Sequence, residues 1–222
     1  MIALLVVVTF LLAVTIDHLI HRQPILVEAE APRVEAPGRP RLVPSIVAGF
    51  EVPDNLRYHQ GHTWALAESP DLVRIGIDDF AAKLTGGVTS IDIPERGQWI
   101  RQGQRIIAMH HNGREIDLVS PIEGTIVGVN QKAIDDPQLA QRDPYGDGWL
   151  LAVNSPDANT NFRNLLGGTI ARRWMDDAAA RLRNIAAPAG ALAQDGGVAV
   201  PNVIEQLPDA DWDRLTKELF LS

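Results

Sequence analysis

The 222-residue chain contains no cysteine and only three lysines, Lys83, Lys132 and Lys217. Without cysteine it has no disulfides, thiolate nucleophiles, iron–sulfur ligands or cysteine-rich zinc sites. Its 20 Lys+Arg stand against 28 Asp+Glu, and a net charge of −8 argues against binding to nucleic acid. The sequence also lacks a Ser/His/Asp arrangement, a Walker loop and a dinucleotide glycine pattern. We therefore expect no enzyme activity, catalytic residue, cofactor, metal or small-molecule substrate.

The longest apolar run stands at the start of the chain, where residues 1–16 carry no charge. With the following residues it reaches roughly 20 positions, the length of a helix that crosses a bilayer. A cleaved signal peptide would need basic residues before the run and a small-residue cleavage site, and neither is present. We expect residues 1–21 to form a single transmembrane helix in contact with lipid.

Basic residues flank this run only on its C-terminal side, at Arg22, Arg33, Arg39 and Arg41. The positive-inside rule then places the rest of the chain in the cytoplasm, anchored to the inner membrane. Residues 22–49 follow as a proline-rich linker with too little apolar surface to fold alone. Its prolines are Pro24, Pro32, Pro37, Pro40 and Pro44.

The middle of the chain has the alternating pattern of short, half-buried strands. Residues 104–109 and 115–119 flank Asn112-Gly113, a strong signal for a hairpin turn. An acidic cap and Gly86-Gly87 delimit a short helix at 78–85. Further strands are predicted at 72–77, 88–93, 124–129 and 149–153. Many short strands at close spacing favour a sandwich or barrel.

Helical periodicity replaces this pattern after Pro156. One apolar stripe is predicted through Ile170, Trp174, Ala178, Leu182 and Ile185. Residues 187–222 are expected to form a flexible segment and then an acidic amphipathic terminal helix. Acidic residues suit the positive start of that helix, and its apolar positions include Trp212, Leu215, Leu219 and Phe220.

Several motifs in the middle region resemble the glycine cleavage system H protein family. They are Tyr58-His-Gln-Gly-His-Thr-Trp64, Val73-Arg-Ile-Gly-Ile-Asp-Asp-Phe-Ala81, Ser120-Pro-Ile-Glu-Gly124 and Asp143-Pro-Tyr-Gly-Asp-Gly-Trp-Leu150, with Gly97, Gly103 and Ile106 at matching spacing. The resemblance implies a lipoyl-type barrel-sandwich hybrid of two small antiparallel sheets with C-terminal helices, over residues 50–186. The predicted fold class is thus α+β, mainly β, after one transmembrane helix.

The resemblance also implies a carrier function, in which a lysine at a hairpin tip holds lipoate. Counting back from Pro121 places that lysine at Gly113, beside Arg114. A guanidinium stays protonated and forms no such amide, so Arg114 is no replacement. Lys83 and Lys132 belong to other predicted elements. We expect the lipoyl carrier function to be lost.

Other polar and aromatic residues are candidates for contacts with a partner. His110 and His111 are adjacent and point to opposite faces of a strand, which excludes joint chelation of a metal. We interpret them, with Asn112 and Arg114, as candidate partner-binding residues of the hairpin. His59 and His62 are expected in a solvated hairpin or a partner contact. Trp64, Trp149 and Trp174 are predicted core residues, whereas Trp99, Trp212 and Phe220 are predicted to touch a partner.

These features predict a non-catalytic, membrane-anchored accessory subunit whose H-protein-like domain docks within a large respiratory or photosynthetic membrane complex. Two alternatives stay open. One is a membrane-tethered lipoyl carrier of one-carbon metabolism that is modified at an unexpected lysine. The other is a periplasmic adaptor of the membrane-fusion type, against which the basic flank after the apolar run argues.

Overall fold

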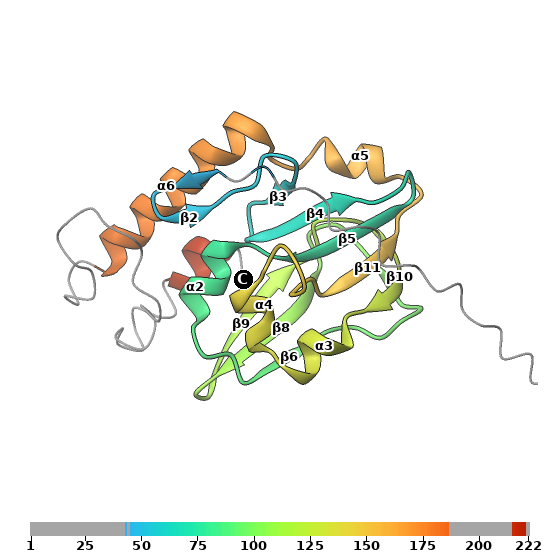
Figure 1. Cartoon of the computed structure of the whole chain (residues 1–222), viewed down its shortest axis with the longest axis horizontal. Helices are drawn as coiled ribbons and strands as arrows, with labels where there is room; N and C mark the ends of the chain where they lie inside the picture. Colours follow the sequence, from blue (N-terminus) through green and yellow to red (C-terminus); the bar gives the residue numbers. More distant parts are fainter. Residues whose placement is uncertain (1–42, 44, 187–214, 221–222) are drawn as a thin grey trace, which may run out of the picture. The chain divides into compact units, whose positions relative to one another are not determined.

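Short antiparallel strands and several helices share one hydrophobic core in the computed structural model (Figure 1), which describes residues 43, 45–186 and 215–220. None of the helices in these residues is long and apolar enough to cross a membrane. The predicted span at 1–21, Trp212 and most of the predicted linker lie outside them. The linker prediction was wrong at its end, because β1 (Ile46–Val47) already pairs with β2 (Phe50–Glu51).

The larger sheet has six strands, and all of its neighbouring strands are antiparallel. In spatial order they are β3 (Arg57–His59), β4 (Thr63–Ala67), β5 (Leu72–Ile77), β11 (Leu151–Asn154), β10 (Gly124–Val129) and β7 (Trp99–Ile100). The central strand β5 has the bounds that its alternating sequence predicts. Apolar side chains from β4, β5 and β11 are fully buried, which places the core against this sheet.

The smaller sheet has three strands in the order β6 (Ser90–Asp92), β8 (Arg105–His111) and β9 (Arg114–Val119). Its long hairpin β8–β9 turns at the predicted Asn-Gly pair. The Thr63 hydroxyl donates to the Val119 carbonyl at 2.9 Å and so links this sheet to β4. The predicted mainly β barrel-sandwich with a few helices is therefore confirmed.

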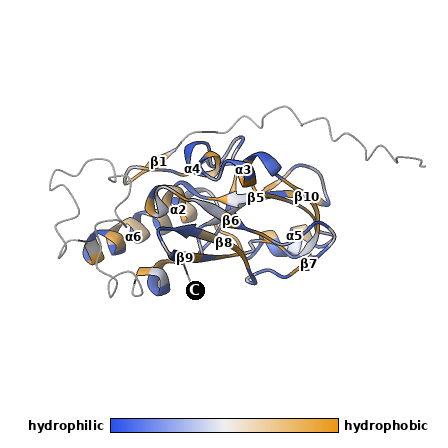
Figure 2. Ribbon diagram, turned by 90° about the horizontal axis from the view of Figure 1, so that it is seen from below, coloured by the Kyte–Doolittle hydropathy of each residue, from blue (hydrophilic) through white to orange (hydrophobic). Residues whose placement is uncertain are grey.

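The helices are α2 (Asp79–Thr85), α3 (Gln131–Asp135), α4 (Gln138–Arg142), α5 (Ala158–Phe162) and α6 (Gly168–Ala186). The carboxylate of Asp78 begins α2 by accepting the backbone N–H of Ala81 at 2.8 Å. On α6 the predicted stripe was partly wrong. Ile170 is 65% exposed, and the buried face is instead Ala171, Met175, Ala178, Leu182 and Ile185. In Figure 2 apolar and polar residues alternate along this helix.

The motif Asp143-Pro-Tyr-Gly-Asp-Gly-Trp-Leu150 holds several elements together. The Tyr145 hydroxyl donates to the Glu51 carbonyl at 2.6 Å and accepts the Asp79 backbone N–H at 2.9 Å. Burial raises the pKa of Tyr145, so its hydroxyl stays protonated and able to donate. The Trp64 indole donates to the Pro144 carbonyl at 3.1 Å. This motif thus ties β2, α2 and β4 to the loop before β11.

Replacing Tyr145 by phenylalanine tests this link. The substitution Tyr145→Phe leaves the buried N–H of Asp79 and the partly buried carbonyl of Glu51 without their partner, so we expect the free energy of unfolding to fall by roughly 1–3 kcal/mol. Urea unfolding followed by tryptophan fluorescence measures the change. The matched control is Gln131→Ala, which removes an exposed hydrogen bond to Asp135 and should change stability by less than about 0.5 kcal/mol. Equal effects of the two substitutions would contradict the assigned role of Tyr145.

Candidate functional site at the hairpin tip

The tip of the β8–β9 hairpin is a two-residue turn in which Asn112 and Gly113 have φ angles of 49° and 77°. Positive φ at both positions is the geometry that Asn-Gly favours in tight hairpins. Both residues are exposed. A Cβ atom added at Gly113 would meet nothing within 4 Å, so only the backbone conformation disfavours a larger residue there.

His111 attaches one side of the tip to the loop that follows α2. Its Nδ1 lies 2.6 Å from the Gly87 carbonyl oxygen, and its Nε2 lies 2.9 Å from the Asn112 side-chain nitrogen. These partners assign the proton to Nδ1, which donates, and leave Nε2 as the acceptor. The fit depends on glycine, because a Cβ on Gly87 would lie 2.8 Å from the ring carbon Cε1 of His111.

His110 attaches the other side of the tip to β6. Its Nε2 lies 2.9 Å from an Asp92 carboxylate oxygen, and its Nδ1 lies 3.8 Å from Glu115. An imidazolium can donate to both carboxylates at once. Ion pairs at this degree of exposure contribute little to stability, about 0–1 kcal/mol. The arrangement therefore orients the tip more than it stabilises the fold.

The tip carries no amine. Lys83 lies on α2, where its ammonium group contacts Asp79 at 2.7 Å and the Gly49 carbonyl at 2.9 Å. Lys132 and Lys217 are exposed on other helical segments. Among the described residues, no three histidine, aspartate or glutamate side chains are grouped to hold a metal ion. The tip can thus offer imidazole, amide and guanidinium groups for docking.

Only part of the predicted partner-binding set comes together. His110, His111, Asn112 and Arg114 share the hairpin, as expected. Trp99 is 51% exposed, but it lies on β7, the edge strand of the other sheet, near α5 in Figure 2. The prediction for Phe220 was wrong, because its side chain is fully buried in the core of this chain. Its ring packs against a buried imidazole of this chain.

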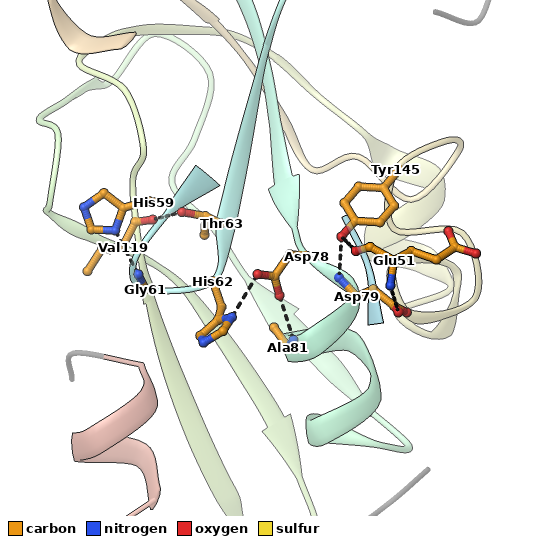
Figure 3. A network of polar contacts seen from close by, with 10 residues as sticks. All are labelled: Glu51, His59, Gly61, His62, Thr63, Asp78, Asp79, Ala81, Val119 and Tyr145. Atoms are coloured by element: carbon orange, nitrogen blue, oxygen red, sulfur yellow. Dashed lines mark hydrogen bonds and ion pairs between the residues drawn. The ribbon is translucent and has the colours of Figure 1, made fainter. Parts of the chain in front are cut away.

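That imidazole belongs to His62, which was expected in a solvated or partner-contacting hairpin and is instead completely buried. Its Nδ1 lies 2.8 Å from the Asp78 carboxylate, and its ring stacks on Phe80 with centroids 4.1 Å apart (Figure 3). The partners are 16 residues apart in sequence and meet because β4 pairs with β5. The sequence did carry a signal for this contact. His62 directly precedes β4 and Asp78 directly follows β5, so an antiparallel pairing of these two strands brings the two side chains together.

The neighbouring His59 has a different environment. Its Nδ1 accepts the backbone N–H of Gly61 at 3.0 Å, as Figure 3 shows. Burial, and to a lesser degree the nearby His62, lower the pKa of His59. A neutral imidazole is what this hydrogen bond requires, since a protonated Nδ1 cannot accept. The turn between β3 and β4 therefore contains one histidine that accepts a backbone N–H and one that donates to the Asp78 carboxylate.

Known proteins resemble the region that contains this hairpin. A family model described as Glycine cleavage H-protein matches residues 56–177, more than half of the chain. The glycine cleavage system H protein of Bifidobacterium longum is 37% identical over 108 residues, which cover 49% of this chain and 78% of that protein. The one from Marinobacter nauticus is 33% identical over 107 residues, covering 48% and 82%.

Among solved structures, the crystal structure of a glycine cleavage system H protein from Mycobacterium marinum matches with a TM-score of 0.49 and 30% identity, covering 54% of this chain and 95% of that one. The region matched by the family model begins directly before β3, extends into α6 and includes the six-stranded and the three-stranded sheet. Because the family model matches more than half of its residues and the Bifidobacterium longum relative is covered to 78% of its length, the chain belongs to the glycine cleavage H-protein family.

Proposed function

We propose that this family member is not a lipoyl carrier but a membrane-anchored accessory subunit, which uses its H-protein domain as a docking module. The proposed setting is a large respiratory or photosynthetic membrane complex. Residues 1–21 would supply the anchor, and the domain would lie in the cytoplasm. The proposal rests on one observation, the hairpin tip, where the position expected for a lipoyl lysine holds Gly113 in a tight turn.

The contacts around the tip support a docking role over a carrier role. A carrier arm has to reach more than one partner enzyme, so a mobile attachment point suits it. Here His110 contacts β6 and His111 contacts the loop after α2, at 2.9 Å and 2.6 Å. A tip fixed on both sides presents a defined surface at a low entropic cost of binding. This surface of imidazole, amide and guanidinium groups fits an acidic or polar patch on a partner.

The second candidate function is a tethered lipoyl carrier that is modified at another lysine. The observation in its favour is that Lys132 and Lys217 are exposed, so each amine is accessible to a modifying enzyme. Against it, neither residue lies at the tip of a hairpin. Lys132 lies on α3, and Lys217 lies in the helical segment near the C-terminus.

A lysine placed at the tip tests the assignment of Gly113. We expect purified lipoate ligase to leave the wild-type chain unmodified and to add one lipoyl group to Gly113→Lys, as read by intact mass. The left-handed φ of 77° should lower the stability of this variant by about 1–2 kcal/mol. Gly103→Lys is the matched control, because Gly103 has φ 81° and equally open space. Modification of both variants, or of neither, would contradict the assignment.

The docking role is tested by isolating the full chain from its native membranes. We expect mild detergent to extract it together with other subunits, and native mass spectrometry to give a mass well above the 24.2 kDa of the chain. The apolar run supplies the anchor, and the domain supplies the contacts. A 24.2 kDa species with no companion would overturn the proposal.

The same isolation applied to hairpin variants locates the contact. His110→Ala removes the ion pairs to Asp92 and Glu115, so we expect the recovery of companion subunits to fall at least threefold. The melting temperature should change little, because these pairs are partly exposed. Arg105→Ala is the matched control, since it removes an exposed ion pair to Asp117 at the far end of the same strand. If both variants retain their companions, the docking surface lies elsewhere.

A further inference from the structure

A short helical segment near the C-terminus, residues 215–220, packs into the core of the H-protein domain. Leu215, Leu219 and Phe220 are at most 2% exposed, whereas Lys217 and Glu218 face solvent. In Figure 1 this segment is drawn in red beside α2. Isolated helices of this length are not stable in water, so its helical form depends on the surface that receives it.

The receiving surface lies where the two sheets meet, and we call it the His62 surface: Gly61, His62 and Val119. The Phe220 ring meets the His62 ring edge-on, with centroids 5.4 Å apart. Gly61 allows the close approach, because a Cβ there would lie 2.8 Å from Val119 Cγ2 and 3.3 Å from the Phe220 carbonyl oxygen. Trp174 of α6 flanks the imidazole at 4.8 Å.

The packed segment leaves a polar atom without a partner. Because Nδ1 of His62 faces the Asp78 carboxylate at 2.8 Å, it must carry a proton. In the neutral ring Nε2 is then an acceptor, and it faces away from Asp78 in Figure 3. Within the described part of the chain this buried Nε2 has no hydrogen-bond partner. A buried acceptor without a donor weakens the closed arrangement, since displacing the segment would let water or another donor reach it.

We propose that residues 215–220 are a displaceable intramolecular ligand, and that the His62 surface receives a short amphipathic helix of a partner subunit in their place. Such a helix presents two apolar side chains four positions apart, as Leu215 and Leu219 do, and a hydrogen-bond donor for Nε2. The donor gives the partner an advantage over the chain's own segment, which holds the site through its covalent tether. This inference rests on the proposed docking function and names its second contact.

The test uses the detergent-solubilised full chain and diethyl pyrocarbonate, which modifies accessible imidazole nitrogens. Leu219→Asp places a charge in the buried contact and should displace the segment, so we expect the rate of His62 modification to rise at least tenfold over wild type. Lys217→Ala changes an exposed residue of the same segment and should behave as wild type. A peptide with the sequence of residues 209–222 should bind the Leu219→Asp protein at least tenfold more tightly than wild type and protect its His62.

A second variant and a spectroscopic measurement show whether the segment can be displaced without unfolding the domain. Phe220→Ala is a milder opening variant, and near-UV circular dichroism reports whether the domain stays folded. If both variants lose their native spectrum, the segment is an integral part of the fold, and the inference is overturned. It is also overturned if His62 stays unmodified in folded variants, if the peptide gives no protection, or if the variants dimerise, since a second copy would then be the occupant.

The two proposals fail in different ways. The peptide measurement needs no partner subunit, so it can fail while the chain still co-purifies with a complex. In that case only the exchange at the His62 surface is rejected. Conversely, the peptide can bind while the chain is extracted without companion subunits. That result would reject the membrane complex but keep the proposal that the C-terminal segment can be displaced from the His62 surface.

Discussion

The buried carboxylate of Asp78 is the constraint on which the arrangement of the site depends. It accepts the Ala81 backbone N–H that begins α2 and the Nδ1–H of His62, each at 2.8 Å, and neither side chain of the His62–Asp78 pair is exposed to solvent. The backbone N–H of Asp78 also donates to the His62 carbonyl at 3.1 Å. Leaving a buried hydrogen-bonding group without its partner costs about 1–3 kcal/mol, so α2 has a fixed start beside β4.

The fixed start of α2 also affects the position of the hairpin tip. Since α2 ends at Thr85, its position determines where Gly87 presents its carbonyl to His111. The imidazole of His62 also supports the C-terminal segment, because it contacts the ring of Phe220. The two surfaces proposed for docking, the tip and the His62 surface, therefore both depend on one buried hydrogen bond, between His62 and Asp78.

Local patterns in the sequence predicted what local forces determine. Strand β5 and strand β10 have the expected bounds because alternation is a property of adjacent residues. The Asn-Gly turn needed no tertiary information either. The His62–Asp78 pair and the burial of Phe220 were missed, because they depend on strand register and on a distant segment. On α6 the small residue Ala171 and the flexible Met175 lie on the buried face, whereas the helical periodicity predicted the larger Ile170 and Trp174 there.

Membership of the family gives the fold, and the tip residues decide which part of the family's chemistry this chain could retain. We propose that in this chain a fixed tip carrying Gly113 has replaced an acyl attachment point with a docking surface. The most direct measurement is the intact mass of the chain isolated from its native membranes together with its companions. The account predicts the unmodified mass of the polypeptide. A lipoyl adduct on any of Lys83, Lys132 or Lys217 would contradict it.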